Sequence, residues 1–217
     1  MAKPLILALE TSSGQCSVAL DGAIQAQLSE PAARSHAARL LPMAEQLLAE
    51  QGLVFADLDA IAFARGPGAF TGVRIAAATA QGLAFALQKP IVPISTLAAL
   101  AWQAIAQGRT QVVSLLDARM GQCYWGHYAA CPELGLQPVQ EDALSQPESV
   151  VAKAELILGE GAQLQQLMPE QMRALPFVSA TPEAWAVAAL ALRQPALWLD
   201  DPALALPQYL RDQVVHQ

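Results

Sequence analysis

The chain has 217 residues, of which 54% are hydrophobic and 14% charged, and its formal net charge is -7. That length is enough for one large domain or for two small lobes. Binding to nucleic acid draws its affinity from Lys and Arg on phosphates, so 12 basic residues with none in a run argue against a protein that binds nucleic acid on its own.

The N-terminal segment predicts three strands joined by polar turns, at residues 5–9, 16–20 and 23–28. Asp21-Gly22 is a strong hairpin signal between the second and the third strand. The first apolar run ends at Glu10 and is too short for the core of a signal peptide or for a membrane span. A turn rich in hydroxyl groups follows it, over residues 10–15.

A helix is predicted after a loop at 29–35, from about His36 to Gln51, with Gly52 as its stop. Five apolar residues recur at helical spacing and are expected to face the core: Leu40, Leu41, Ala44, Leu47 and Leu48. Pro42 cannot donate an N–H, which predicts a kink or a late start. His36 is interpreted as a capping or surface histidine, because no second metal ligand lies near it in the sequence.

The segment Arg65 to Arg74 predicts a strand, a tight glycine turn and a helix N-terminus. The turn residues are Gly66, Pro67, Gly68 and Gly72. Gly66 and Gly68 allow backbone angles that a Cβ disfavours, and Thr71 is a candidate N-cap. The spacing is neither GxGxxG nor a P-loop. Two interpretations stay open, a steric turn between closely packed elements and an anion site at a helix N-terminus.

Residues 75–87 are almost entirely Ala, Leu and Phe, and predict a helix that is buried on several sides. One side is expected to pack on a sheet, and the other is lined with small residues. The low charged fraction fits a face covered by a partner, and fits equally an Ala-rich core. The second side of this helix therefore contacts either another protein or the first helix of the same chain.

The second half repeats the pattern of a strand, an acidic turn and a strand, at residues 112–116, 117–121 and 122–128. Ahead of it, a strand is predicted at 90–94 and a helix at 96–107 capped by Ser95. Beyond it the prediction is a loop at 132–144, a strand at 156–158, and helices at 162–167 and 182–192, the latter capped by Thr181. The tail from Pro202 to Gln217 is expected to pack against the first half.

The cysteines and histidines form no readable cluster. Cys16, Cys123 and Cys131 include no Cys-x-x-Cys pair, which argues against a disulfide framework or a zinc site and indicates a reducing, cytoplasmic setting. The three histidines lie in unlike contexts, and the serines near Gly14 have no evident base partner. No catalytic residue is therefore assigned.

The glycine segment, read Gly-Pro-Gly-x-Phe-Thr-Gly-x-Arg, resembles the signature of the TsaB (YeaZ) family. Its members are short relatives of TsaD, the subunit that makes threonylcarbamoyladenosine in tRNA. Three further stretches agree with the family: Ile6 to Ser12, Ser35 to Pro42, and Tyr209-Leu210-Arg211. The resemblance is close over residues 5–100 and looser beyond them.

This resemblance implies an α/β fold of the actin-like (ASKHA, ribonuclease H-like) type with two lobes, the second one reduced. The lobes would span residues 1–108 and 109–217, with the tail returning to the first lobe. In such folds two turns hold the phosphates of ATP across a cleft. That makes Thr11 and Ser12 candidate phosphate contacts, places Asp117 opposite Glu10, and puts Gly159 beside the adenosine. Ordinary polar turns are the alternative, so the cofactor expectation is none, with weak or vestigial ATP or ADP binding at most.

The sequence departs from TsaD where TsaD carries its metal ligands, a His-x-x-x-His pair whose two side chains share one helix face. The matching positions here are Thr96 and Leu100, and neither can replace an imidazole. No metal is therefore expected.

The resemblance implies a non-catalytic partner that holds a TsaD-like subunit in its working form for threonylcarbamoyl transfer to adenosine beside the tRNA anticodon. A TsaE-like ATPase would be a further partner, tRNA would be met only through the complex, no membrane contact is expected, and the isolated chain would form a homodimer. The expected interface residues lie on the helices starting near 36 and 71: Leu40, Met43, Leu47, Arg74, Ala77 and Gln81. The alternatives are a small actin-like ATPase or sugar kinase, and, far behind, a glycoprotease.

Overall fold

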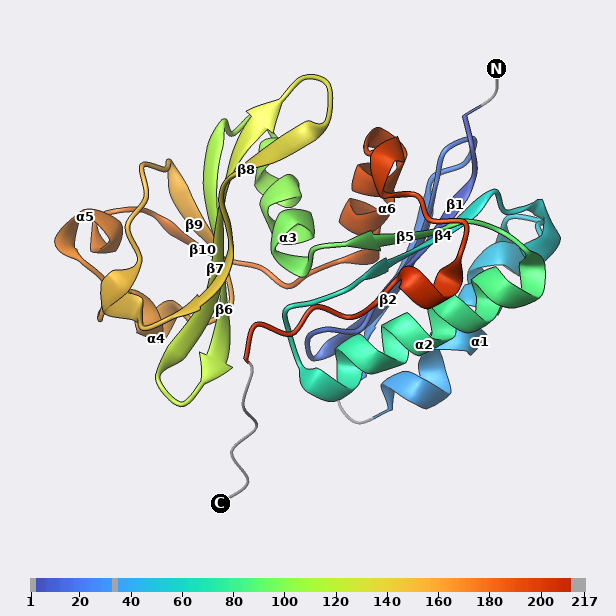
Figure 1. The fold of residues 1–217 in the computed structure, drawn as a ribbon, viewed down its shortest axis with the longest axis horizontal. Helices are drawn as coiled ribbons and strands as arrows, with labels where there is room; N and C mark the ends of the chain where they lie inside the picture. Colours follow the sequence, from blue (N-terminus) through green and yellow to red (C-terminus); the bar gives the residue numbers. More distant parts are fainter. Residues whose placement is uncertain (1–2, 33–34, 212–217) are drawn as a thin grey trace.

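The computed structural model describes residues 3–32 and 35–211 and shows two lobes side by side (Figure 1). The first lobe holds a five-stranded sheet in the order β3-β2-β1-β4-β5. Its strands are β1 (Ile6–Glu10), β2 (Gln15–Asp21), β3 (Ala26–Pro31), β4 (Ala60–Ala64) and β5 (Ile91–Ile94). Strand β1 is antiparallel to β2 and parallel to β4. Helices cover both faces of this sheet, so its central strands are continuous apolar runs rather than alternating ones.

The second lobe repeats this arrangement, with the strand order β10-β9-β6-β7-β8. Its strands are β6 (Gln111–Arg119), β7 (Gln122–Cys131), β8 (Gly135–Ser145), β9 (Leu156–Gly159) and β10 (Phe177–Ser179). In both sheets the first strand lies in the middle, pairs antiparallel with the next one and parallel with a later one. This duplication confirms the predicted two-lobed α/β architecture. The helices α4 (Ala162–Gln165) and α5 (Glu170–Arg173) have one turn each, which fits a reduced second lobe.

The predicted loop at 132–144 is wrong, because β8 occupies most of it. Five consecutive residues of this edge strand, 137–141, are exposed, and they include Pro138, Gln140 and Glu141. A strand of this composition shows no apolar alternation, and pairing with β7 is what makes it a strand. The predicted loop at 29–35 is also shortened, since β3 extends to Pro31.

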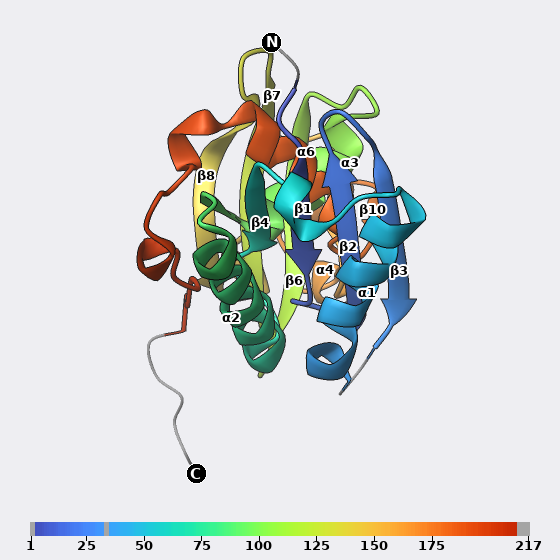
Figure 2. The same ribbon diagram turned by 90° about the vertical axis from the view of Figure 1, so that its right-hand side faces the viewer.

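Helices α1 (His36–Glu50) and α2 (Phe70–Leu87) lie side by side on one face of the first sheet (Figure 2). Pro42 does not delay α1, because the side chains of Pro42 and Ala38 are exposed on the outer face of the helix. The Ala38 carbonyl that would accept from position 42 can bond to water there. Helix α2 starts at Phe70 with Ala69 as its N-cap and no capping side chain, so the predicted Thr71 cap is wrong.

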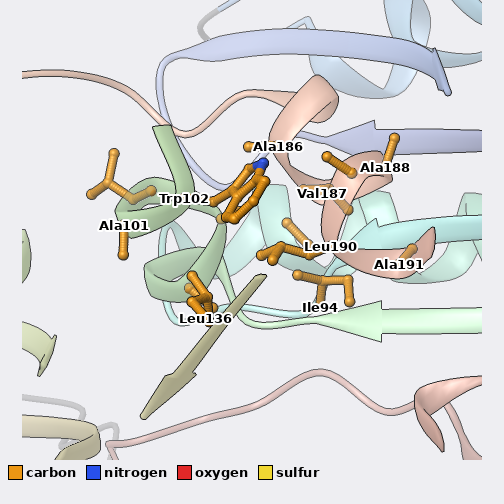
Figure 3. Packing of buried hydrophobic residues seen from close by; sticks show 14 of the residues in the cluster. Ile94, Ala101, Trp102, Leu136, Ala186, Val187, Ala188, Leu190 and Ala191 are labelled. Atoms are coloured by element: carbon orange, nitrogen blue, oxygen red, sulfur yellow. The ribbon is translucent and has the colours of Figure 1, made fainter. Parts of the chain in front are cut away.

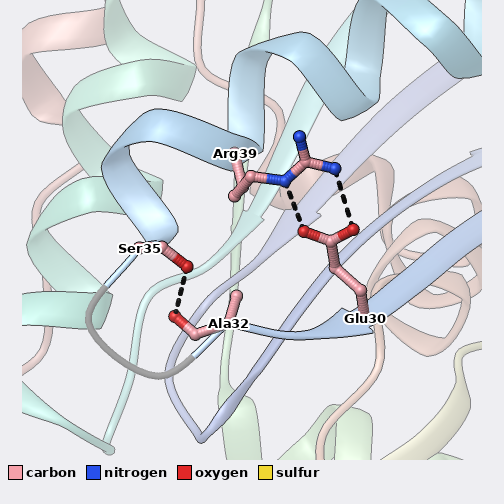
Figure 4. Close-up of polar contacts among 4 residues, drawn as sticks. All are labelled: Glu30, Ala32, Ser35 and Arg39. Carbon is pink, nitrogen blue, oxygen red and sulfur yellow. Dashed lines mark hydrogen bonds and ion pairs between the residues drawn. The ribbon is translucent and has the colours of Figure 1, made fainter.

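The start of α1 is fastened to the neighbouring strand (Figure 4). The Ser35 hydroxyl donates to the Ala32 carbonyl at 3.2 Å. Arg39 forms a two-point ion pair with Glu30 of β3, its Nε lying 2.5 Å from Oε1 and its second nitrogen 2.9 Å from Oε2. These contacts hold the first turn of α1 on the edge of the sheet, next to the polar turn after β1.

The other face of the first sheet is covered by α6 (Ala184–Arg193), which packs against β1 and β2. The Ala184 N–H donates to the Ser17 hydroxyl on β2 at 2.9 Å. Thr181 is not its cap, because the helix starts two residues later than predicted, with Glu183 at the N-cap. The chain therefore returns to the first lobe already at α6, before the tail at 202.

Helix α3 (Thr96–Ile105) joins the lobes, since it packs on both α6 and the second sheet. The Ser95 hydroxyl accepts the Ala98 N–H at 3.1 Å, which confirms the predicted cap. Figure 3 shows Trp102 of α3 beside Leu190 of α6, with Ile94 nearby. One apolar core thus runs between the two sheets, and α1 and α2 enclose a second core on the outer face of the first sheet.

Candidate functional site

A cleft of about 1170 Å³ opens between the lobes. Its walls are the turn after β1, the N-terminal end of α2, the turn between β6 and β7, and the tail. Ser12 and Asp117 both line it, together with Pro67 and Gly68 of the glycine segment. The structure therefore brings the two predicted turns to the same cavity. Their role toward phosphate stays a prediction.

Thr11 does not face this cleft. Its side chain is fully buried, and its hydroxyl donates to the Gly72 carbonyl at 2.7 Å. The predicted phosphate contact at Thr11 is therefore corrected to a structural bond between the turn and α2. A strand-end threonine of this kind has no sequence feature that tells which way its hydroxyl points.

Ser12 is the hydroxyl of this turn that remains uncommitted. Its N–H donates to Glu10, and its carbonyl accepts the Ala69 N–H at 2.7 Å. The Ser12 Oγ is buried and has no hydrogen-bond partner within the described residues. The backbone of Ser12 is thus fixed from both sides, and its Oγ lies on the cleft wall.

Three carboxyl groups gather at this end of the cleft. Glu10 is fully buried and does not line the cleft, whereas Asp117 does, and desolvation raises the pKa of Glu10 to about 7. Burial also raises the pKa of Glu160, whose charge adds to the rise at Glu10. Asp117 accepts the Arg119 N–H at 2.7 Å and lies 3.6 Å from the Arg119 guanidinium. Sequence reasoning missed Glu160 as a cleft residue, although it directly follows Gly159.

Gly159 does not line the cleft. Its φ is 147°, and a Cβ there would lie 1.9 Å from the Leu115 carbonyl oxygen. The glycine is therefore explained by close packing of β9 on β6, and the adenosine contact predicted for it is not supported by its position.

The glycine segment packs directly onto the turn after β1. A Cβ on Gly68 would lie 2.6 Å from the Ser12 carbonyl oxygen, and one on Gly72 would lie 1.8 Å from that of Thr11. Gly66 has a φ of 102°, whereas Gly68 has no left-handed φ, so the unusual backbone conformation expected at Gly68 is wrong. These distances favour the steric interpretation of the turn. The Ala69 N–H, one candidate donor to an anion, is already bonded to Ser12.

Aromatic and basic side chains form the mouth of the cleft. The Arg74 guanidinium stacks 3.6 Å from the centre of the Phe70 ring, and its Nε donates to the Tyr209 hydroxyl at 2.9 Å. Arg211 donates to the Ala118 carbonyl at 3.0 Å and to the Gln122 side chain at 2.9 Å. The tail therefore contacts both lobes. Its Tyr-Leu-Arg ending was the sequence signal for this region.

Most of the residues predicted to form the interface point into the chain, so that part of the prediction is wrong. Leu40, Met43, Leu47 and Ala77 are at most 2% exposed and belong to the core under α1 and α2. Gln81 is half-buried and donates to the carbonyls of Pro202 and Ala205, both at 3.1 Å. Among the six, only Arg74 is exposed.

The outward face of α2 carries small and apolar residues instead, namely Ala78, Gly82, Phe85 and Ala86. Phe85 is 79% exposed. By length and hydropathy α2 could span a membrane, since its 18 residues have a mean hydropathy of 1.2. Its other face packs on the first sheet, and a core helix of a folded α/β lobe has the same composition.

Thr96 and Leu100, the positions that the resemblance matches to the metal-binding histidines of TsaD, lie fully buried in α3. Within residues 3–32 and 35–211, no group of three or more His, Cys, Asp or Glu side chains is placed to hold a metal ion. His36, which lines the cleft, has its Nε2 3.1 Å from the Gln15 carbonyl oxygen.

Residues 27–215 match the family described as TsaD, tRNA N6-adenosine threonylcarbamoyltransferase. The tRNA threonylcarbamoyladenosine biosynthesis protein TsaB of Escherichia coli is 41% identical over 159 residues, which are 71% of this chain and 68% of that protein. The chain belongs to the TsaB (YeaZ) family.

Further TsaB relatives extend this result. The TsaB protein of Haemophilus influenzae is 47% identical over 122 residues, 55% of this chain and 52% of that protein. The solved structure of YeaZ from Pseudomonas aeruginosa, at 40% identity, covers 95% of this chain and 100% of its own, with a TM-score of 0.88. A second solved P. aeruginosa structure, described as similar to the peptidase YeaZ, has a TM-score of 0.89 at 41% identity and covers 96% of this chain and 100% of its own. The likeness to YeaZ therefore includes the second lobe, where the sequence motifs are sparse.

Proposed function

We propose that this chain is a non-catalytic partner of a TsaD-like subunit and is required for threonylcarbamoyl transfer to adenosine beside the anticodon of tRNA. The observation that carries the proposal is that α3, in a chain that matches the transferase family, has no histidine at residues 96 and 100. Thr96 and Leu100, which the resemblance matches to the metal pair of TsaD, are fully buried in the core. The chain shares the fold of the transferase without the groups that would bind its metal.

The cleft supports a non-catalytic role. A nucleophile needs a base within hydrogen-bond reach, and the Ser12 hydroxyl has no partner within the described residues. The nearest carboxyl, Glu10, bonds to the Ser12 backbone and is buried behind it. These contacts use the Glu10 carboxyl to hold the turn together, and no hydrogen-bonded nucleophile–base pair is found among the described residues that line the cleft.

The partner surface is the outward face of α2 and the adjoining part of α1. It presents Ala78, Gly82 and Phe85 from α2, and Leu41 from α1. Small residues allow another helix to approach closely, and exposed apolar area is stabilised when a partner covers it. A TsaD-like relative carries the corresponding helices, so it can replace one copy in a contact that also forms the homodimer. The net charge of -7 is consistent with contact to tRNA only through the complex. The protein would act in the cytoplasm.

The cleft is best described as a vestigial nucleotide site. Two strand–turn–strand units face each other across it, which is the one observation in favour of the ATPase alternative. Against that alternative, the Thr11 hydroxyl is committed to Gly72, and Glu160, a carboxyl group and not a hydrogen-bond donor to phosphate, lines the cleft near Ser12 and Asp117. Titration calorimetry with MgATP and MgADP checks this point. Tight binding together with hydrolysis that is lost in Asp117→Ala would favour the enzyme.

The test of the main proposal is reconstitution of the tRNA modification. The purified chain is mixed with TsaD and the TsaE-like ATPase of the same cell, tRNA, and a source of threonylcarbamoyl adenylate. Modified adenosine should form only when this chain is present, and the chain should co-purify with TsaD. Full modification without it, or no association with TsaD, would refute the proposal.

A further inference from the structure

A largely buried polar cluster, outside the lining of the cleft, joins the two lobes. The Ser95 hydroxyl, at the end of β5 in the first lobe, donates to the Asp142 Oδ2 at 2.6 Å. The Tyr128 hydroxyl of β7 donates to the other oxygen of the same carboxylate. Asp142 on β8 is thus held by one donor from each lobe. Charged and buried acceptors make stronger hydrogen bonds than neutral exposed ones, so this bond between the lobes is a substantial constraint.

The second sheet is shaped around this cluster. A Cβ on Gly126 would lie 2.9 Å from the Asp142 Oδ1 and 2.8 Å from the Tyr128 ring, so the glycine leaves the space that the pair occupies. The charge of Arg65, at the end of β4, favours the ionised Asp142 and opposes the rise in its pKa that burial causes. The Arg65 Nε is itself buried and has no hydrogen-bond partner among the described residues.

The tail, which lines the cleft, makes a second connection between the lobes. On the first lobe, the Gln208 N–H donates to the Arg65 carbonyl at 2.7 Å, and Tyr209 accepts from Arg74 at 2.9 Å. Only two residues after Tyr209, Arg211 bonds to the Ala118 carbonyl at 3.0 Å on the second lobe. A short stretch of backbone therefore spans the boundary between the lobes.

We propose that these two connections, Ser95–Asp142–Tyr128 and residues 208–211, clamp the lobes at one angle, so that the cleft does not open and close. Arg65 contributes to both connections, because its carbonyl accepts from the tail and its charge favours the ionised Asp142. Two-lobed enzymes use hinge closure around a ligand. For a scaffold, as proposed above, a fixed angle between the lobes strengthens partner binding, since a preformed binding face loses less conformational entropy on association.

The experiment measures the distance between the lobes directly. Spin labels are placed at Val54→Cys and Leu167→Cys, both on exposed residues, in a Cys131→Ser background. Double electron–electron resonance is recorded with the labelled protein diluted in unlabelled protein, so that only distances within one chain contribute. We expect one narrow distance distribution that MgATP does not change. A broad or two-peaked distribution in this protein would overturn the proposal.

The variants test each clamp separately. Asp142→Ala and Arg211→Ala should each broaden the distribution, and the double variant should broaden it more than either. Glu141→Ala is the matched control, because it removes the neighbouring carboxylate of β8, which is exposed. If Asp142→Ala does not fold, the width of the distance distribution is compared for Asp142→Asn and the tail variant Arg211→Ala instead. A folded double variant with the unchanged narrow distribution would show that the clamps do not set the angle. The readout is independent of tRNA modification and of TsaD.

Discussion

Gly72 and Thr11 touch backbone to backbone: a Cβ on Gly72 would lie 1.8 Å from the Thr11 carbonyl oxygen, and the Thr11 hydroxyl donates to the Gly72 carbonyl at 2.7 Å. The first turn of α2 therefore packs directly on the end of β1. This contact explains why the chain needs glycine inside a helix, where glycine is otherwise unfavourable.

Gly72→Ala should destabilise the protein by about 2 kcal/mol or more, because the helix must move away from β1 to admit a methyl group. Gly82→Ala is the matched control in the same helix, since a Cβ there meets nothing within 4 Å. That control should gain roughly 0.5–1 kcal/mol from helix propensity. Urea denaturation checks both values, and equal stability of the two variants would contradict the close contact.

Gly68→Val should also lower stability, for a steric reason and not a conformational one. Its Cβ would lie 2.6 Å from the Ser12 carbonyl oxygen, and backbone cannot yield as a flexible side chain can. Thermal denaturation of the variant should show a melting temperature several degrees below the wild type. If the two melt together, the turn is not closely packed, and an anion or partner role for it gains support.

Glu10→Gln should make the protein more stable above neutral pH. Burial raises the pKa of Glu10 from 4.5 to about 7 in the folded chain. Between these values the folded state keeps a proton that the unfolded state has lost, so wild-type stability falls as the pH rises from 4.5 to 7 and the whole penalty is present above 7.

The penalty that Glu10→Gln removes is on the order of a few kcal/mol at pH 8. Urea denaturation at pH 5 and pH 8 should show a smaller fall in stability for the variant than for the wild type. Glu45→Gln, on the exposed face of α1, serves as the isosteric control and should follow the wild type. A variant whose stability falls as steeply as that of the wild type would mean that Glu10 is not the titrating group.

Ala78→Glu should weaken the homodimer and the complex with TsaD while the chain stays folded. The residue is exposed on the outward face of α2, and a charge there must be desolvated when a partner covers it. Ala77→Glu, one position earlier, instead places the charge in the core and should unfold the chain, because Ala77 is 2% exposed. Circular dichroism and analytical ultracentrifugation distinguish the two outcomes. A dimeric, TsaD-binding Ala78→Glu protein would exclude this face.

The purified chain should contain no stoichiometric iron or zinc, because Thr96 and Leu100 supply no metal ligand and lie in the core. Elemental analysis of protein prepared without chelators checks this. One tightly bound metal ion per chain would contradict it and would reopen the enzymatic alternatives.

Local features of the sequence were enough to predict the order of strands and helices in the first lobe and the Ser95 cap, whereas they left the steric and the anion-binding interpretations of the glycine segment both open. Each of these depends on a few neighbouring residues, such as an apolar run bounded by turn residues. The repeated strand–turn–strand pattern at 112–128 likewise predicted the second lobe, and the motif from Arg65 to Arg74 indicated the TsaB family.

Only the tertiary structure decided which way the side chains face. Helix α2 is apolar on nearly every side, so its sequence has no polar stripe to show that Ala77 points inward and Ala78 outward. Strand β8 has polar, exposed residues and forms because β7 offers it a partner, not because of its own pattern. Thr11, a hydroxyl that could face either the cleft or α2, takes its direction from the absence of a side chain at Gly72, 61 residues further along the chain. Contacts between distant segments fix such directions, and a local pattern does not contain them.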